Sequence, residues 1–397
     1  MRALIADLPA SRIREVADAG LGRSDVLAFW FGESDEITPV PVRDAAVTSI
    51  EAGETFYSPN LGLPELRAAL AAQVSRLHAP PVPIGPERIA VTSSGVSALM
   101  LAQQALVEAG DEVVVVVPVW PNLAAQPAIL GARVRRVSLR AGAGGVWSLD
   151  LDALLAAVTP ATRVLIVNAP NNPTGWTMSR AEQQALLAHC RRTGTWIVAD
   201  EVYERLHYPQ DPPPAGSAEA ARLCAPSFLD IAAPGDRLIV IHSFSKSFLM
   251  TGWRLGSLIA PEALMPHIAK LIEFNTSCAP VFVQRAGLAA LAAAPEAVPA
   301  LQARLRLCRD TLVDALQALP RVEVARPDGA MYAFLRIEGE PDSLALARRL
   351  VAEHGLGLAP GSAFGPEGEG WLRWCFASRQ PQRLLAGVDR LARALAL

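Results

Sequence analysis

Four short apolar runs, each rich in valine and isoleucine, constrain the fold of this chain more than any other feature. The runs are Glu112–Trp120, Arg163–Pro170, Thr195–Tyr203 and Arg237–Ser245. Continuous apolar runs of this length are typical of strands in a parallel sheet that helices cover on both faces. Helical stretches alternate with them at residues 97–110, closed by Gly110, and 179–194, which begins at Ser179 and ends at Gly194. This alternation predicts an α/β layered domain, which we place at residues 46–285.

Residues 286–397 differ in character from the part before them. Long helices rich in alanine, leucine and arginine alternate there with strand-like runs at residues 330–337 and 370–377. This pattern predicts a smaller α+β domain, and we expect the N-terminal segment, residues 1–45, to pack with it. Residues 141–145 and 211–221 consist largely of small residues and proline and are predicted to be surface loops.

The composition narrows the classes of function. The chain has 397 residues, a formal net charge of −3 and a pI near 6.1, whereas nucleic-acid binders usually carry a clustered basic surface. It contains no apolar run long enough for a signal peptide or a membrane span. Its five cysteines are scattered without CxxC spacing, and His189 beside Cys190 has no further ligand nearby. We therefore expect a cytoplasmic protein with reduced thiols that binds no nucleic acid, membrane or metal.

Polar side chains follow three of the four runs at the point where each strand is predicted to end. Residues 171–175 read NNPTG, residues 200–203 read DEVY, and residues 243–246 read SFSK. Each residue alone has an ordinary structural role in a turn, a helix cap or a core. Ligands of open parallel sheets bind beyond the carboxyl ends of the strands, so together these residues predict a binding site.

The last of these motifs contains one of only two lysines, Lys246 and Lys270, in a chain with 34 arginines. A lysine that is desolvated or lies beside other cations can lose its proton and form an imine with an aldehyde. Arginine stays protonated and has no such chemistry. Lys246 is therefore the predicted covalent residue of the site.

The surrounding residues predict a phosphate site. Arg254 offers a forked cationic donor, Ser243 offers a hydroxyl, and the turn at residues 92–99, TSSGVSAL, leads into a helix whose N-terminus can bind an anion. An amine, an acid and a phosphate cradle fit a phosphorylated, nitrogen-containing aldehyde. Pyridoxal 5′-phosphate has all of these groups.

With these motifs in place, the chain resembles a class I/II aminotransferase of the pyridoxal-phosphate fold type I, or aspartate aminotransferase, superfamily. The motifs YSPNLGLPELR, NNPTG, ADEVY and SFSKSFLMTGWRLG occur in this order, and the resemblance covers nearly the whole chain. It implies a large domain with a mostly parallel seven-stranded sheet between helices. It also implies a smaller α+β domain, built from the C-terminal part and the N-terminal segment.

The resemblance also implies roles for individual residues around the cofactor. Lys246 is the Schiff-base lysine and proton carrier, Asp200 partners the pyridine nitrogen, and Tyr203 and Asn172 donate to the phenolic oxygen. Trp120 stacks on the cofactor ring. The phosphate is held by Ser94, Gly95, Val96, Ser243 and Arg254, together with Tyr57 from the neighbouring subunit of a homodimer with shared active sites.

Arg373 is implied to bind the α-carboxylate of an amino acid or 2-oxo acid substrate, with Gly32, Trp120 and Asn172 beside it. Relatives that use aspartate place a lysine at the position of Val96, and an aliphatic side chain cannot pair with a second carboxylate. With Trp120 nearby and Ile37 expected at the border of the pocket, we expect neutral, apolar or aromatic amino donors.

Three alternatives compete with a ping-pong aminotransferase. A carbon–sulfur β-lyase would use the same cofactor residues, and the motifs do not separate the two. A pyridoxal-phosphate-binding transcription regulator would need a winged-helix domain ahead of the fold, whereas the family pattern begins by residue 11. A non-catalytic scaffold is disfavoured because every cofactor residue is present.

Overall fold

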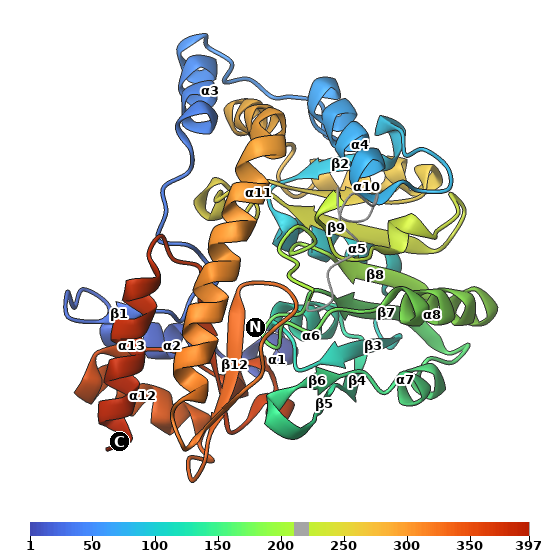
Figure 1. Ribbon diagram of the computed structural model, residues 1–397. Coiled ribbons are helices and arrows are strands. Elements are labelled where there is room, and N and C mark those ends of the chain that lie inside the picture. The colour runs from blue at the N-terminus through green and yellow to red at the C-terminus, as the bar shows by residue number, and fades with distance from the viewer. Residues whose placement is uncertain (210–221, 397) are drawn as a thin grey trace.

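The computed structural model describes residues 1–209 and 222–396, so the loop predicted at residues 211–221 lies outside the described residues. A seven-stranded sheet forms the centre of the molecule in the order β2-β10-β9-β8-β7-β3-β4 (Figure 1). All neighbouring strands are parallel except β10, which runs antiparallel to both of its neighbours. The predicted fold class, a mostly parallel α/β sheet, is confirmed. The strands are β2 (Ile89–Thr92), β3 (Glu112–Val117), β4 (Arg133–Ser138), β7 (Thr162–Asn168), β8 (Trp196–Asp200), β9 (Leu238–Ser243) and β10 (Gly256–Ile259).

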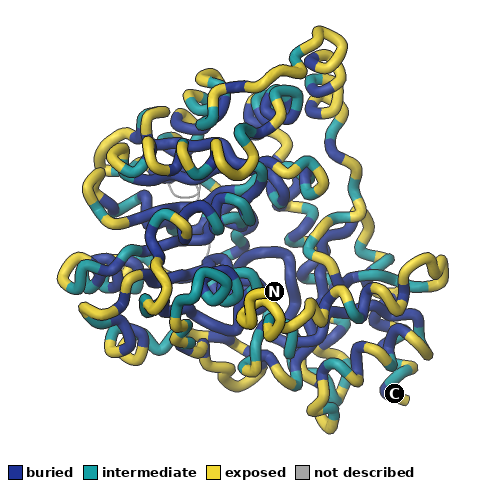
Figure 2. Tube along the Cα trace, turned by 180° about the vertical axis from the view of Figure 1, so that it is seen from behind, coloured by how far each residue is buried: buried dark blue, intermediate teal, exposed yellow. Residues whose placement is uncertain are grey.

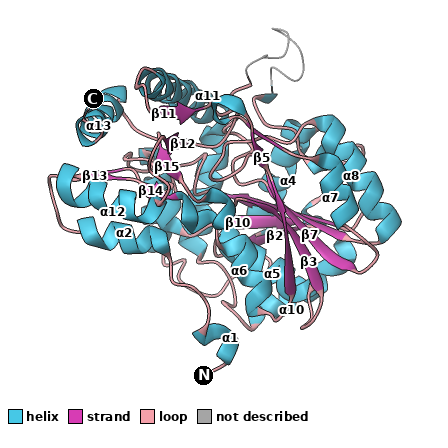
Figure 3. Ribbon diagram, turned by 90° about the horizontal axis from the view of Figure 1, so that it is seen from below, coloured by secondary structure: helices cyan, strands magenta, loops and turns pink. Residues whose placement is uncertain are grey.

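The strands are apolar throughout because helices cover both faces of the sheet (Figure 3). In β3, Val113, Val115 and Val117 pack with one set of helices, whereas Val114 and Val116 face the other set. Alternation of side chains along a strand sends successive valines to opposite faces. One layer contains α5 (Gly95–Leu106), α6 (Asn122–Ile129) and α10 (Met265–Glu273); the other contains α4 (Pro64–His78), α7 (Leu151–Ala157) and α8 (Arg180–Thr193).

Of the two predicted helices, one ends where the sequence predicts and the other ends earlier. Helix α8 has Ser179 as its N-cap in a capping box with Glu182, and Gly194 ends it with a φ of 74°, as predicted. The predicted end at Gly110 is wrong, because α5 stops at Leu106. Val107 has already turned into extended backbone and is buried, and Gly110 lies in the following turn.

The C-terminal part contains a four-stranded antiparallel sheet in the order β11-β12-β15-β14. Its elements are α11 (Val281–Gln317), β11 (Val322–Val324), β12 (Tyr332–Ile337), α12 (Ser343–His354), β13 (Leu356–Gly357), β14 (Ala359–Pro360), β15 (Trp371–Cys375) and α13 (Pro381–Ala394). The predicted domain boundary at residue 285 falls inside α11, which runs without a break beside both parts. The division into domains therefore stays a prediction.

The N-terminal segment reaches several parts of the molecule. Its elements are α1 (Ala3–Ala6), α2 (Arg12–Gly20), β1 (Leu27–Ala28) and α3 (Val40–Glu51). Strand β1 pairs in parallel with β13, α2 packs on α12, and α3 packs along α11. Residues 141–145 belong to a hairpin between β5 (Arg140–Ala141) and β6 (Trp147–Ser148), and four of the five residues are exposed.

Burial follows this arrangement, with the central strands buried and the outward helix faces exposed (Figure 2). Among the described residues, one helix, α11, is long and apolar enough by length and composition to cross a membrane. Of its most apolar 18-residue window, 44% is buried, and α11 packs against α3, α4 and α13. These contacts are those of a core helix.

Candidate active site

A cavity of about 370 Å³ lies beyond the carboxyl ends of β7, β8 and β9, against the C-terminal part. Paired registers place Asn168 beside Asp200 and Asp200 beside Ile241, so the ends of these three strands adjoin. The cavity brings together eleven of the site residues predicted from the sequence: Gly32, Gly95, Val96, Trp120, Asn172, Asp200, Tyr203, Ser243, Lys246, Arg254 and Arg373.

Lys246 lies in the turn after β9 and extends its amine into this cavity. The pKa of the Lys246 ammonium is lowered to about 8, chiefly by burial; the cations Arg373 and Arg254 act in the same direction, and Cys375 and Glu33 oppose them. Its Nζ donates a hydrogen bond of 2.6 Å to the carbonyl oxygen of Gly32. A minor neutral fraction of this amine therefore exists near neutral pH, larger than for an ordinary lysine, and nucleophilic attack on an aldehyde requires this form.

Asp200 ends β8 on the floor of the same cavity. Burial raises the pKa of its carboxyl group to about 7, and the backbone N–H of Val202 and the charge of Lys246 act in the opposite direction. A cationic ring nitrogen beside Asp200 would favour the ionised carboxylate. The residue is therefore suited to pair with a protonated heterocycle.

Tyr203 contacts a second tyrosine that the sequence analysis did not single out. The hydroxyls of Tyr203 and Tyr332 are 2.7 Å apart, and burial raises the pKa of both phenols. Tyr332 also explains the glycine at position 32, because a Cβ there would lie 2.0 Å from the Tyr332 hydroxyl. Only glycine permits this close approach of the two walls.

One end of the cavity offers only donors and a cation. Ser94 caps α5 by accepting from the backbone N–H of Ser97, which leaves the first N–H groups of α5, at Gly95 and Val96, beside the cavity. Strand β10 supports this turn closely, since a Cβ at Gly256 would lie 2.5 Å from the Gly95 nitrogen. Ser243, Ser245 and Arg254 complete this end of the cavity. Such a set of donors at a helix N-terminus fits a phosphate group.

Arg373 on β15 is held rigidly at the opposite side. Its side chain donates to Asn172 Oδ1 at 2.9 Å and to the carbonyl oxygen of Trp30. The guanidinium carbon lies 4.4 Å from the ring centre of Tyr332 and 4.8 Å from that of Phe364. Its buried Nε has no hydrogen-bond partner within the described part of the chain. A planar guanidinium fixed in this way suits bidentate binding of a carboxylate.

Some predicted residues lie away from the cavity. Ser94 acts behind its wall as the cap of α5. Tyr57 is 88% exposed in the segment between α3 and α4, and a single chain does not bring it to the site. The expectation that Ile37 borders the pocket is wrong for the cavity of one chain, because Ile37 is 76% exposed and does not line it.

Sequence reasoning also missed cavity residues from the N-terminal segment. Ile13 and Arg14 from α2, and Phe31 after β1, line the cavity. The guanidinium of Arg14 lies 5.8 Å from the ring centre of Phe31, and Arg14 forms no ion pair within the described residues. The motif SRIREV marks an amphipathic helix, but no local signal shows that this helix borders a site far along the chain.

The donor set fits pyridoxal 5′-phosphate. The phosphate-binding end, the carboxylate of Asp200 and the amine of Lys246 match the phosphate, the ring nitrogen and the aldehyde of this molecule. The unpartnered Nε of Arg373 leaves capacity for a carboxylate of a substrate.

The chain is similar to known proteins over nearly its whole length. Residues 30–391 match the family described as "Aminotransferase class I and II". The chain is 30% identical to an aspartate aminotransferase of Pyrococcus horikoshii, over 97% of this chain and 94% of that protein. It is 32% identical to an arginine–pyruvate transaminase of Pseudomonas aeruginosa, over 88% and 85%. The structure of an aromatic aminotransferase from Pyrococcus horikoshii superposes with a TM-score of 0.85 at 28% identity, covering 96% of this chain and 98% of that one.

Proposed function

This chain belongs to the class I and II aminotransferases and is a pyridoxal-phosphate-dependent transaminase acting on amino acids and 2-oxo acids, and we propose that Lys246, Asp200 and Arg373 carry its reaction. The observation that supports this most is Lys246, a buried amine of lowered pKa facing the same cavity as Asp200 and Arg373. Pyridoxal phosphate supplies an electron-accepting ring that stabilises the charge left when a bond to the substrate Cα breaks.

Each residue of the cavity has its own role in the proposed reaction. Arg373 takes the α-carboxylate of the amino donor and so fixes which Cα bond faces the ring. Lys246 Nζ removes the proton from Cα in one half reaction and supplies a proton to the 2-oxo acid in the other. Asp200 keeps a cationic ring nitrogen protonated, while Tyr203 and Asn172 donate to the phenolic oxygen. Ser243, Arg254 and the start of α5 hold the phosphate.

For the substrate side chain we propose a preference for neutral, apolar or aromatic donors. Val96 occupies the cavity wall at the start of α5, where it offers no charge to a second carboxylate, and Trp120 and Leu99 add apolar surface. Burial of an unpaired carboxylate costs several kcal/mol. A second candidate class of substrate is the dicarboxylic amino acids. Arg14 lines the cavity, and its cation can bind their distal carboxylate.

The rate of single-turnover amination of the bound cofactor decides between these substrates. We expect L-methionine, L-leucine and L-phenylalanine to react more than about 100-fold faster than L-aspartate, the equivalent of about 3 kcal/mol for an unpaired carboxylate. The measurement is the change in cofactor absorbance after rapid mixing. Release of ammonia and pyruvate, monitored in parallel, separates transamination from β-elimination.

Two variants sharpen this test. Val96→Lys should raise the rate with L-aspartate, whereas Arg14→Gln should leave the apolar donors unchanged. If wild-type protein prefers L-aspartate and Arg14→Gln removes that preference, the argument from Val96 is wrong. Arg14 then binds the distal carboxylate of the substrate.

We further propose a homodimer in which Tyr57 reaches the phosphate site of the partner subunit. The support is an exposed segment with apolar side chains: Val40, Val47 and Ile50 of α3, and Phe56 and Tyr57 after it, are each at least 49% exposed. Large apolar surface of this kind marks an interface. A cytoplasmic location is proposed as well, supported by five cysteines that form no disulfide.

Mixing a Lys246→Ala chain with a Tyr57→Ala chain tests the shared site. Lys246→Ala lacks the amine, and Tyr57→Ala is expected to weaken cofactor binding by about 10-fold or more, because one charge-assisted hydrogen bond contributes about 1.5–3 kcal/mol. Co-refolded heterodimers contain one complete site, so activity at limiting cofactor should reappear. Mixing Lys246→Ala with Asp200→Ala is the control. Each of these residues serves the site of its own chain, so neither site of this heterodimer is complete. A fully active monomer would contradict the proposal.

A further inference from the structure

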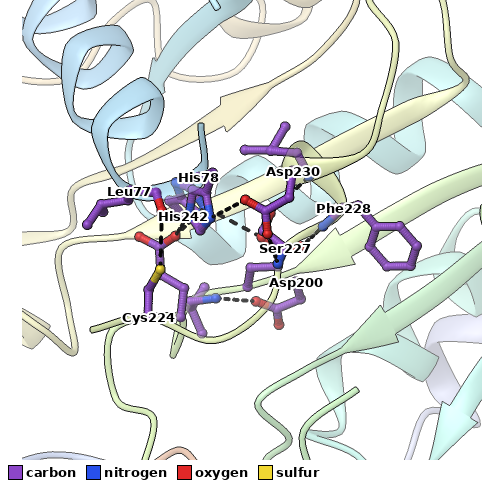
Figure 4. A network of polar contacts seen from close by, with 12 residues as sticks. Leu77, His78, Asp200, Cys224, Ser227, Phe228, Asp230 and His242 are labelled. Carbon is purple, nitrogen blue, oxygen red and sulfur yellow. Dashed lines mark hydrogen bonds and ion pairs between the residues drawn. The ribbon is translucent and has the colours of Figure 1, made fainter. Parts of the chain in front are cut away.

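A buried cluster of two imidazoles and a carboxylate lies between α4 and the seven-stranded sheet, outside the cofactor cavity (Figure 4). His78 is the last residue of α4, His242 lies on β9, and Glu204 belongs to the segment after β8. All three are buried, and their potential ligand atoms lie within 4.8 Å of one another. None of them has a part in the transamination described above.

The two imidazoles converge on one carboxylate oxygen. His78 Nε2 is 2.5 Å from Glu204 Oε2, and His242 Nε2 is 3.1 Å from the same oxygen. Within the described residues, His242 Nε2 nevertheless makes no hydrogen bond of acceptable geometry, although its side chain is only 11% exposed. Two ring nitrogens aimed at one carboxylate oxygen are satisfied either by an N–H on each ring, which donates to that oxygen, or by a metal ion between them.

Two further carboxylates, Asp230 and Glu201, lie near the rings. Asp230 Oδ1 lies 3.5 Å from His78 Nδ1, and Asp230 itself accepts from the backbone N–H of Ser227 and from Arg180. Glu201 Oε2 lies 3.9 Å from His242 Nε2, on the same side of that ring as Glu204. A carboxylate behind a histidine sets which ring nitrogen holds the proton and so turns the other nitrogen's lone pair toward a metal. Asp230 lies on the Nδ1 side of His78 in this way, at the distance of an ion pair and without a hydrogen bond.

There is also space for a further ligand. A cavity of about 20 Å³ adjoins the cluster, bordered by His242, Glu201 and Glu204. One water molecule needs about 10–15 Å³. Three protein ligands and a water complete the four-coordinate arrangement that Zn²⁺ commonly adopts.

We propose that His78 Nε2, His242 Nε2 and a Glu204 oxygen bind one divalent transition-metal ion, Zn²⁺ or a close substitute, with water as the fourth ligand. When both rings start as imidazolium, the ion replaces one proton on each ring, and the net charge of the cluster does not change. Ligand atoms on a tetrahedral Zn²⁺ lie about 3.3 Å apart, given bonds of about 2.0–2.1 Å, so the contact between His78 and Glu204 opens by less than about 1 Å.

Such an ion would join three elements that surround the cofactor site. Helix α4, strand β9 and the segment after β8 meet at the cluster, and this segment also carries Tyr203, while β9 leads to Lys246. The role is structural, since no ligand faces the cavity where the reaction takes place. The sequence did not reveal these ligands, because they lie at positions 78, 204 and 242 without any local spacing motif.

Metal content of the full-length holoenzyme tests the proposal. Protein expressed in medium containing zinc, passed through a brief chelator wash and gel filtration, should hold close to one metal per chain by elemental mass spectrometry. His78→Gln and His242→Gln should each lower this ratio by about 10-fold or more, because the loss of one ligand weakens binding by at least the 10–100-fold seen for outer-shell changes. His267→Gln, at an exposed histidine on α10, is the matched control and should keep the wild-type ratio.

A second measurement does not depend on the variants folding. Wild-type protein unfolded with EDTA, refolded and reconstituted with cofactor should take up Co²⁺ to one equivalent per chain. A difference spectrum against the Zn²⁺-loaded protein should then show d–d bands of tetrahedral cobalt. Wild-type protein without stoichiometric metal and without saturable cobalt uptake overturns the proposal and leaves two ring protons as the occupants of the cluster.

Discussion

Replacing Lys246 with arginine is expected to abolish transamination while leaving the fold intact. The positive charge survives, but the primary amine is lost, and with it both the imine chemistry and the base that moves the Cα proton. Loss of general acid–base catalysis alone costs about 10²–10⁴-fold, so the fall in kcat should exceed about 10⁴-fold. Steady-state kinetics with a good donor, together with circular dichroism, provide the measurement.

Lys270→Arg is the matched control, because the only other lysine is exposed on α10. Borohydride should fix the cofactor to Lys246, and peptide mass spectrometry should locate it there. In cofactor-free protein, reductive capture of an added aldehyde at Lys246 should increase as the pH rises through about 8, because the neutral amine forms above the lowered pKa. An active Lys246→Arg enzyme, or a label on Lys270, would overturn the assignment.

The second large effect is expected from Arg373→Gln. Arg373 is 2% exposed and sits between two aromatic rings, so a substrate carboxylate bound to it is largely desolvated. Removing one partner of a buried charge pair costs about 2–5 kcal/mol, which corresponds to a fall in kcat/KM of about 30-fold to several thousand-fold. The loss should be similar for all amino donors, because every donor carries the α-carboxylate.

Arg373→Lys separates charge from shape, since lysine keeps the charge but cannot form the forked contact. Arg336→Gln is the control on the same sheet, because Arg336 lies on the outward side of β12 and pairs with Glu323. We expect it to change kcat/KM less than twofold. Equal losses in the Arg336 and Arg373 variants would show that the effect arises from the sheet and not from the carboxylate contact.

The sequence predicts the parts of the fold and the site that depend on local pattern. The four valine- and isoleucine-rich runs became β3, β7, β8 and β9, and the motifs at their ends meet in one cavity because parallel strands end at a common edge. Ser179 and Gly194 mark the ends of α8 because capping chemistry is local. The predicted helix end at Gly110 is wrong because a glycine in a turn and a glycine at a helix end look alike in sequence. The structure shows that the helix already ends at Leu106.

The remainder depends on packing between distant segments. Strand β10 joins the sheet antiparallel through the pairing of Gly256 with Thr92 and Ser243, which its short sequence does not specify. Tyr332 and Arg14 come to the cavity from elements far from its motifs. The hydrophobic periodicity of the sequence does not indicate such contacts between distant segments. The predicted contact of Tyr57 with the phosphate requires a second chain.

Helix α11 has a consequence for how the molecule unfolds. It contributes Ala286 and Ala290 to the core on the side of the large sheet, and Leu305 and Leu312 to the core near the four-stranded sheet, within one continuous cluster of buried residues. If the core beside either sheet unfolds, α11 loses apolar contacts that also stabilise the core beside the other sheet. Cooperativity requires such interdependence, and parts that lack it melt separately. We therefore expect the two sheets to unfold together, in a single transition, and not as separate units.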